Sequence, residues 1–438
     1  MKQNKLLEMM FDHSRWEMAV DKANEKHINL TVLKELAKPH VRVQLYQMIV
    51  NEQLELSPSH MAQIPKDTPG EFRTVFIAED VDRVILSIIN DCLFELFPDM
   101  VHPQCRSYKS GESCGKTVQE VSRKIVKLTK NTNNNHIGMK YDFKKYFDNV
   151  DLNAILNVFD EVEKRLGFEK GTEPVMNLLR KYYKSNLVFD LDGNLTEMYM
   201  GLRQGVATAS FLADVILYEL DEYMSNKYEC YYRYSDDLVV ITKDTSEITD
   251  DINKIICKYG VTLNPKKVEC LYNDKWFKFL GFNIKGNMIT LSKNRVKKFQ
   301  KEIVSRTLDK PNITFDQARK NIINYLYIGD YCWATSCLGV INCKQDINEM
   351  NKFILDCLRA VKVRETKKRK DKVPISKIGG LGVVTNLPDR TILRGTGKNV
   401  TSNRNKTDKH IENYLTMGCL SNAIKMNKAI YQACVRSL

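Results

Sequence analysis

Two adjacent aspartates, Asp236 and Asp237, stand inside a stretch of aromatic and β-branched residues that runs from Tyr231 to Ile241. This composition is typical of strands, so the stretch predicts a tight hairpin with the carboxylates at its turn. Neighbouring carboxylates repel each other and are costly to bury unless a divalent cation neutralises them. Oxygen ligands of this kind suit Mg²⁺, although an acidic turn in solvent would have the same sequence.

A third carboxylate stands at the end of another predicted strand. Residues Ile137 to Asp142 have a strand pattern, and the turn that follows presents Phe147. A two-metal site needs a carboxylate that bridges both ions, and Asp142 would supply it beside Asp236 and Asp237. The three acids together therefore predict a site for divalent cations at the strand ends.

A second predicted hairpin carries two cations. Residues Ile64 to Ile77 have Pro-Gly at the turn and alternating residues after it, with Lys66 and Arg73 on opposite arms. An arginine forms planar paired hydrogen bonds with phosphate and a lysine acts as a point charge, so this pair suits a triphosphate. Exposed cations on hairpins are more often only solvated.

The composition favours a polyanionic partner. Of the 438 residues, 67 are Lys or Arg and 54 are Asp or Glu, which gives a formal charge of +13. Clustered cations gain free energy by releasing counterions from phosphates, so nucleic acid is the first expected partner and a membrane surface the second. The 12 cysteines include no Cys-x-x-Cys pair, which argues against zinc ribbons and a disulfide scaffold.

The start of the chain lacks the pattern of a signal peptide, and no apolar run reaches the length of a membrane span. A cytoplasmic protein with reduced thiols and no membrane partner is therefore expected. The basic, glycine-punctuated loop from His102 to Thr117 can lie along a nucleic-acid backbone, with contacts expected from Arg106, Lys109 and Lys116.

A second basic segment runs from Lys362 to Lys372 and has seven basic residues among eleven. Such a run is usually a solvated face, but it follows three segments of helical apolar spacing that begin near Asn294. Contacts with a nucleic-acid backbone are expected from four consecutive cations of this run, Lys367, Lys368, Arg369 and Lys370.

The order of these segments resembles that of reverse transcriptases of the prokaryotic, group II intron-like kind. The resemblance extends from about Ile64 to Leu291. Five motifs carry it, matched here by Asp142 to Asp148, Gly201 to Gly205, Tyr234 to Asp237, Asn264 to Lys267 and Phe279 to Gly281. Five motifs in family order at suitable distances make a chance match negligible.

The resemblance implies an α/β right-hand polymerase fold, with fingers, a palm built on a small antiparallel sheet and a helical thumb. The expected domains are an N-terminal helical extension at 1–60, fingers and palm at 61–291, the thumb at 292–361 and a basic C-terminal extension at 362–438. The implied activity is RNA-directed DNA synthesis, in which deoxynucleoside triphosphates and an RNA template give a cDNA by two-metal nucleotidyl transfer.

The resemblance also implies the ligands of the metals. Asp142, Asp236 and Asp237 would bind two Mg²⁺ ions, or Mn²⁺ in their place, together with the backbone carbonyl of Phe143. Lys267 would give a proton to the leaving pyrophosphate.

Four further residues match nucleotide-binding positions of the family. Lys66 and Arg73 would grip the triphosphate, and Phe147 would exclude a 2′-hydroxyl group. Gln204 would lie near the template base and the incoming nucleotide.

The sequence also departs from the family. Gln204-Gly205-Val206-Ala207 stands where members often have Gln-Gly-Ser-Pro, and neither retron signatures nor a His/Cys-rich endonuclease tail is visible. The chain is therefore most like the stand-alone reverse transcriptases of bacterial anti-phage defence, some of which copy a dedicated structured noncoding RNA. The alternatives are a maturase-like RNA-binding protein, an RNA-dependent RNA polymerase and a terminal transferase. The primer and the oligomeric state stay open.

Overall fold

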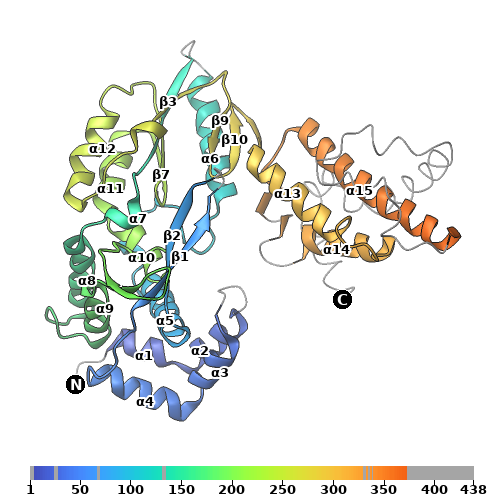
Figure 1. Ribbon diagram of the computed structural model, residues 1–438. Coiled ribbons are helices and arrows are strands. Elements are labelled where there is room, and N and C mark those ends of the chain that lie inside the picture. Colours follow the sequence, from blue (N-terminus) through green and yellow to red (C-terminus); the bar gives the residue numbers. More distant parts are fainter. Residues whose placement is uncertain are drawn as a thin grey trace. The chain divides into compact units, whose positions relative to one another are not determined.

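The computed structural model describes residues 4–23, 28–66, 70–130, 135–328, 332–333, 336–337 and 339–371, without the side chains of residues 344 and 366–371. Two compact units divide the chain, and Figure 1 labels their helices and strands. The first unit comprises Met1–Glu112 and His136–Leu271, and the second comprises Ser113–Asn135 and Tyr272–Leu438. None of the described helices is long and apolar enough to cross a membrane.

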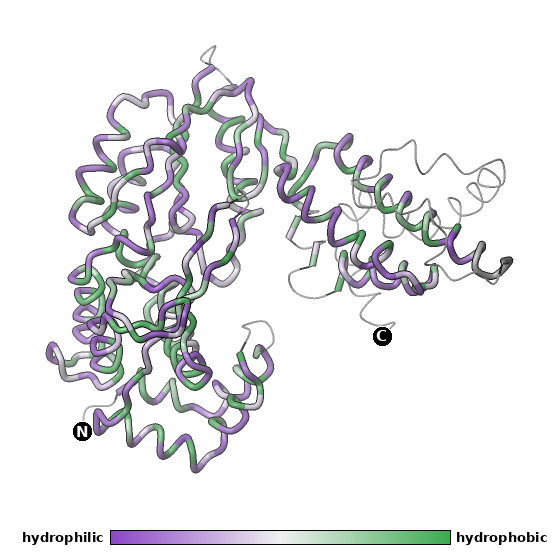
Figure 2. Tube along the Cα trace, viewed as in Figure 1, coloured by the Kyte–Doolittle hydropathy of each residue, from purple (hydrophilic) through white to green (hydrophobic). Residues whose placement is uncertain are grey.

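The first unit begins with four helices: α1 (Lys5–Phe11), α2 (His13–Asp21), α3 (Leu30–Leu36) and α4 (Pro39–Val50). The side chains of Asn4, Asp12 and Asn29 accept hydrogen bonds from the first free N–H groups of α1, α2 and α3, which fixes where these helices start. Their apolar faces join one core with the long helix α5 (Asp80–Leu96). Hydrophobic residues run through the interior of this unit (Figure 2).

A four-stranded sheet has the order β2-β1-β4-β5. Its strands are β1 (Ser59–Pro65), β2 (Phe72–Ile77), β4 (Leu187–Phe189) and β5 (Leu195–Glu197). The predicted basic hairpin is confirmed, because β1 and β2 pair antiparallel with Ile64 opposite Arg73. Its turn residues 67–69 lie outside the described residues.

A second four-stranded sheet has the order β6-β7-β3-β8. Its strands are β3 (His136–Asp142), β6 (Cys230–Tyr234), β7 (Asp237–Ile241) and β8 (Glu269–Tyr272). The predicted acidic hairpin is confirmed, since β6 pairs antiparallel with β7, and β7 pairs antiparallel with β3. The further helices of this unit are η1 (Pro98–Met100), α7 (Tyr146–Asn149), α8 (Leu152–Leu166), α9 (Pro174–Lys184), α12 (Ile248–Ile256), η2 (Cys257–Tyr259) and η3 (Pro265–Lys267).

One sequence prediction is wrong. The absence of Gly and Pro after Val206 predicts a single helix as far as Lys227, but the structure has two, α10 (Ala209–Val215) and α11 (Tyr218–Lys227). The Arg233 side chain donates to the carbonyl oxygens of Ala213 (3.0 Å) and Asp214 (2.8 Å). In a continuous helix these carbonyls would accept from N–H groups four residues later, so a tertiary contact breaks the helix here.

The second unit contains α6 (Cys114–Thr129) and a three-stranded sheet of order β11-β10-β9. Its strands are β9 (Phe277–Phe279), β10 (Phe282–Lys285) and β11 (Met288–Leu291), followed by the helices α13 (Lys293–Arg306), α14 (Phe315–Tyr327) and α15 (Lys344–Asp371). The Ser122 hydroxyl donates to the carbonyl of Gly286 (2.7 Å) and ties α6 to this sheet. Mixed helices with small, mainly antiparallel sheets confirm the predicted α/β class.

Candidate active site

The structure brings the three predicted aspartates together. Asp237 is the first residue of β7 and faces Asp142, the last residue of β3, in the antiparallel register. Asp236 lies in the two-residue turn between β6 and β7, where its carbonyl accepts from the N–H of Phe143 (3.2 Å). Three carboxylates from two chain segments therefore gather at one end of the sheet.

The environment disfavours the charged form of two of these carboxylates, those of Asp236 and Asp237. Burial and the charge of Asp142 raise the pKa of Asp236, against the opposing charges of Lys267 and Arg73. Burial and the charges of Asp236 and Asp142 raise the pKa of Asp237 to about 7. Carboxylate oxygens that repel one another can be neutralised by a divalent cation, which prefers oxygen ligands. Among the described side chains, however, no group of three or more is arranged to hold a metal ion.

Lys267 contacts the acid that is expected to bridge the metals. Its ammonium group donates to Asp142 Oδ2 (2.7 Å), and the N–H of Asn264 donates to the Asp142 carbonyl (2.8 Å). Burial disfavours the charged lysine, but its hydrogen bond to Asp142 and the other carboxylates outweigh burial and raise its pKa. Lys267 is therefore a protonated donor that is still half exposed, as an acid near a leaving group must be.

Backbone hydrogen bonds link the segment of Phe147, the predicted sugar-discriminating residue, to the segment of Gln204, the predicted template-binding residue. The Phe147 carbonyl accepts from the N–H of Leu202 (2.7 Å), and a Cβ on Gly201 would lie 2.2 Å from that same oxygen. The Gln204 carbonyl in turn accepts from the N–H of Phe76 in β2 (2.7 Å). These backbone bonds join the Phe147 turn, the loop of Gln204 and the basic hairpin.

The two cations of that hairpin are exposed. Lys66 has its ammonium group 3.5 Å from Glu71 Oε2, and its charge acts to lower the pKa of Asp148. The charge of Arg73 acts in the same way on Asp236. The charge of Arg73 thus acts on Asp236 and that of Lys66 on Asp148, and both cations keep an exposed surface for a polyanionic ligand.

Arg106 and Lys109, for which the sequence predicts nucleic-acid contacts, have partners within their own chain. Arg106 donates to Glu112 (3.0 Å) and lies over the ring of Tyr232, with the guanidinium carbon 5.2 Å from its centroid. Lys109 donates to the carbonyls of Val101 (3.1 Å) and His102 (2.7 Å). These contacts stabilise the conformation of the loop, because both cations bind acceptors of their own chain.

The other predicted nucleic-acid contacts lie elsewhere. Lys116 is exposed in the first turn of α6. The helix α15 includes the positions 367–370, but the side chains of Lys367, Lys368, Arg369 and Lys370 lie outside the described part of the chain, as do all residues from 372 onward.

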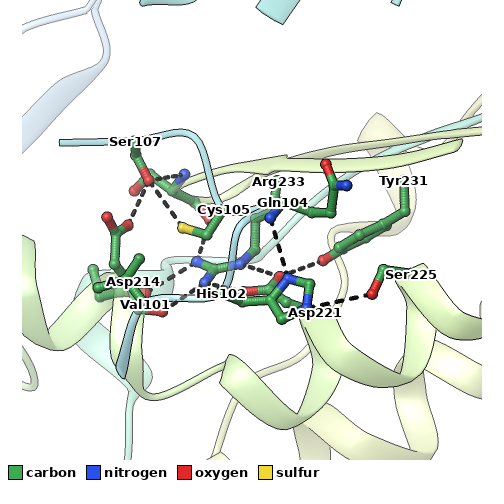
Figure 3. A network of polar contacts seen from close by, with 12 residues as sticks. Val101, His102, Gln104, Cys105, Ser107, Asp214, Asp221, Ser225, Tyr231 and Arg233 are labelled. Carbon is green, nitrogen blue, oxygen red and sulfur yellow. Dashed lines mark hydrogen bonds and ion pairs between the residues drawn. The ribbon is translucent and has the colours of Figure 1, made fainter. Parts of the chain in front are cut away.

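A buried polar network beside the acidic turn is absent from the sequence prediction (Figure 3). At its centre, Arg233 donates to both carboxylate oxygens of Asp221 (2.7 and 2.6 Å), and neither side chain is exposed. Tyr231 donates to the same carboxylate (2.7 Å). The only sequence signal was a charged residue inside an otherwise apolar strand, which indicates a buried ion pair but not its partner.

A comparison with known proteins identifies the family. Residues 64–284 match the model of the reverse transcriptase (RNA-dependent DNA polymerase) family. A protein named for intron 2 of COX1/OXI3 in Saccharomyces cerevisiae is 24% identical over 202 residues. That match takes in 46% of this chain, and the chain spans only 21% of the relative's length.

Two solved telomerase structures are partly similar. One, from Candida tropicalis without its C-terminal domain, is 16% identical, with a TM-score of 0.40, and the match covers 56% of this chain and 59% of that one. The other, from Candida albicans with a fragment of telomeric RNA, is 12% identical, with a TM-score of 0.41 and coverage of 84% and 71%. The family match itself covers half of the sequence, and the chain belongs to the reverse transcriptase (RNA-dependent DNA polymerase) family.

Proposed function

We propose that this protein is an RNA-directed DNA polymerase that copies an RNA template into cDNA. The observation that supports the proposal best is the register of β3 and β7, which sets Asp142 opposite Asp237 and beside Asp236 within the family match. An RNA-binding protein without catalysis would have no need for three crowded carboxylates.

The residues at the sheet end would hold the reacting groups. Asp142, Asp236, Asp237 and the carbonyl of Phe143 would bind two Mg²⁺ ions, or Mn²⁺. When bound, these cations would activate the primer hydroxyl and neutralise charge on the triphosphate. Lys267, which is half exposed and donates a hydrogen bond to Asp142, would give a proton to pyrophosphate.

The surrounding residues would select and orient the nucleotide. Lys66 and Arg73 would bind the triphosphate from the hairpin, because both are exposed cations and the charge of Arg73 acts on Asp236. The half-buried ring of Phe147 would occupy the space of a 2′-hydroxyl, with its backbone fixed by Leu202. Gln204 would contact the template base and the nucleotide.

The decisive experiment removes two carboxylates without changing their shape. The double variant Asp236→Asn with Asp237→Asn should lose at least about a thousandfold in deoxynucleotide incorporation on a primed RNA template, since charge stabilisation by the metals supplies most of the rate. RNA affinity should be unchanged, because backbone contacts use other residues. The matched control is Asp190→Asn with Asp192→Asn, which changes two acids in another hairpin turn of the same unit. Incorporation that survives in the first variant would refute the site.

The choice of sugar separates the proposal from an RNA-dependent RNA polymerase. Phe147→Ala should admit ribonucleoside triphosphates at least about tenfold better, while deoxynucleotide use falls only modestly, because one ring produces the exclusion by contact. Wild-type protein that already uses both sugars equally would favour the RNA polymerase. Extension that ignores the template sequence would favour a terminal transferase.

We further propose that the template is one dedicated structured noncoding RNA, in a system of bacterial anti-phage defence. The formal charge of +13 supports a large RNA partner, and a folded RNA is selected by shape through phosphate and 2′-hydroxyl contacts. The defence role follows only from the resemblance to stand-alone enzymes. Sequencing the RNA that copurifies with the protein tests the idea: one dominant species supports it, and a mixture that follows cellular abundance contradicts it.

A further inference from the structure

The segment from Gln104 to Ser107 lies along the acidic hairpin like an additional strand. The N–H of Arg106 donates to the carbonyl of Arg233 (2.8 Å), and the N–H of Arg233 donates to the carbonyl of Gln104 (3.0 Å). Cys105 forms a parallel bridge with Arg233. This places Ser107 next to the turn that carries Asp236.

The turn residue Ser235 is gripped on both sides of its backbone. Its N–H donates to Ser107 Oγ (2.9 Å), and its carbonyl accepts from Arg233 Nη1 (3.3 Å). Ser235 has a φ of 56°, in the left-handed region that disfavours residues with a side chain. The two hydrogen bonds hold the backbone in this unfavourable conformation directly before the catalytic aspartates.

Ser107 is itself fixed. It is fully buried, and its hydroxyl donates to Asp214 Oδ1 (2.5 Å) while it accepts from Ser235. A serine hydroxyl has one proton to donate, so both of its principal bonds have a defined direction here. The position of Ser107 therefore depends on Asp214 in α10 as well as on the Gln104 to Ser107 segment (Figure 3).

We propose that Ser107 is a positioning residue of the polymerase, which sets the backbone of the catalytic turn and through it the carboxylates of Asp236 and Asp237. This inference rests on the proposed function. Within the described part of the chain, the hydrogen bonds of Ser107 reach Cys105, Asp214 and Ser235 and none of the expected metal ligands, so Ser107 would act through Ser235. A small displacement of reacting groups is enough to cost a large factor in rate.

The kinetic test compares two buried serines of the same unit. Ser107→Ala should lower kcat for deoxynucleotide incorporation about tenfold or more, with KM for the nucleotide within about twofold, because orientation is lost and binding is not. The matched control is Ser59→Ala, since Ser59 is also fully buried and its hydroxyl hydrogen-bonds to another side chain, Tyr182 (2.7 Å). Equal kcat for the two variants would overturn the proposal.

A second measurement needs no activity. Amide hydrogen exchange in peptides that cover residues 230–241 should be faster in Ser107→Ala and unchanged in Ser59→Ala. Ser107→Thr, which keeps the hydroxyl, should restore most of the protection and of kcat. Unchanged exchange in Ser107→Ala, or faster exchange with normal kcat, contradicts the positioning role. A wild-type protein that is inactive on every primed template contradicts the proposed function instead. The exchange data then still report whether Ser107 stabilises the backbone of the turn.

Discussion

Two tight turns, one in each unit, differ in how their backbones are supported. The turn Ser235-Asp236 joins β6 to β7, and the turn Leu280-Gly281 joins β9 to β10. Each has two residues between paired strands, and the first residue is left-handed in both, with φ of 56° at Ser235 and 49° at Leu280. Positive φ at this position is what hairpins with two-residue turns require.

The second turn is supported by its own sequence and a neighbour. Gly281 has a φ of 78°, which glycine tolerates, and Arg295 packs against it so closely that a Cβ would lie 2.4 Å from Arg295 Nε. The Arg295 guanidinium carbon also lies 4.4 Å from the centroid of the Phe282 ring.

The acidic turn has no glycine, and Asp236 occupies its second position. Its backbone is held by Ser107, which lies 128 residues away in the sequence, by Arg233 of the same hairpin and, through Arg233, by Asp221. The left-handed conformation of Ser235 therefore depends on side chains outside the two-residue turn. This difference predicts different responses to mutation in the two units.

The largest expected difference concerns the two arginines. Arg233→Met should destabilise the first unit by about 3–5 kcal/mol, because it leaves Asp221 buried and unpaired. Arg295→Met in the second unit should cost less than about 1.5 kcal/mol, since this arginine is half exposed and loses mainly ring stacking. Urea denaturation followed by hydrogen exchange resolves the two units. Equal losses of unfolding free energy in the two variants would show that the two turns depend on their arginines to the same extent.

The next effect is a pH dependence confined to the first unit. Burial raises the pKa of Asp214 to about 7, from 3.8 in a model peptide, against the opposing charge of Arg233. A pKa that is higher in the folded state stabilises the protein at low pH, and this stabilisation is lost as the pH rises toward 7. Between pH 5.5 and 8 the wild type should lose about 2 kcal/mol relative to Asp214→Asn, which does not titrate. Parallel stability curves would show that Asp214 is ionised throughout.

A third effect tests the second turn. Gly281→Ala should destabilise the second unit by about 1–2 kcal/mol, because alanine is strained at positive φ and its Cβ meets Arg295. Thermal unfolding of this variant beside Gly193→Ala, where φ is 84° and no atom lies within 4 Å of a Cβ, separates strain from crowding. Equal destabilisation of Gly281→Ala and Gly193→Ala would mean that the Arg295 side chain moves away from the new methyl group without a measurable loss of stability.

The smallest effect sharpens the view of the acidic turn. Ser235→Gly relieves the left-handed strain but increases the freedom of the unfolded chain, so the free energy of unfolding should change by less than about 1 kcal/mol. Denaturation of this variant should contrast with Arg233→Met. A loss above 2 kcal/mol would show that the Ser235 side chain, and not only its backbone, supports the turn.

The sequence predicted those features whose signals are local. The alternation around Asp236 and Asp237 predicted the β6–β7 hairpin, and the apolar spacing predicted α13 and α14. The order of motifs predicted the family, which the match over residues 64–284 confirms. Where a distant residue competes for backbone acceptors, as Arg233 does at Ala213 and Asp214, the local pattern predicted one helix instead of two.

The sequence by itself determined the acidic hairpin, the basic hairpin and the strand that ends at Asp142, because hydrophobic periodicity and turn composition act over a few neighbouring positions. Only the tertiary structure decided which residues support them. The sequence shows only that the loop of Arg106 and Lys109 is basic. In the fold these two side chains donate hydrogen bonds to acceptors within the chain, and the loop brings Ser107 to Ser235. The sequence determines the type of each side chain, whereas the fold selects its partner, as when Ser107 reaches the backbone of Ser235, 128 residues away, which no local pattern encodes.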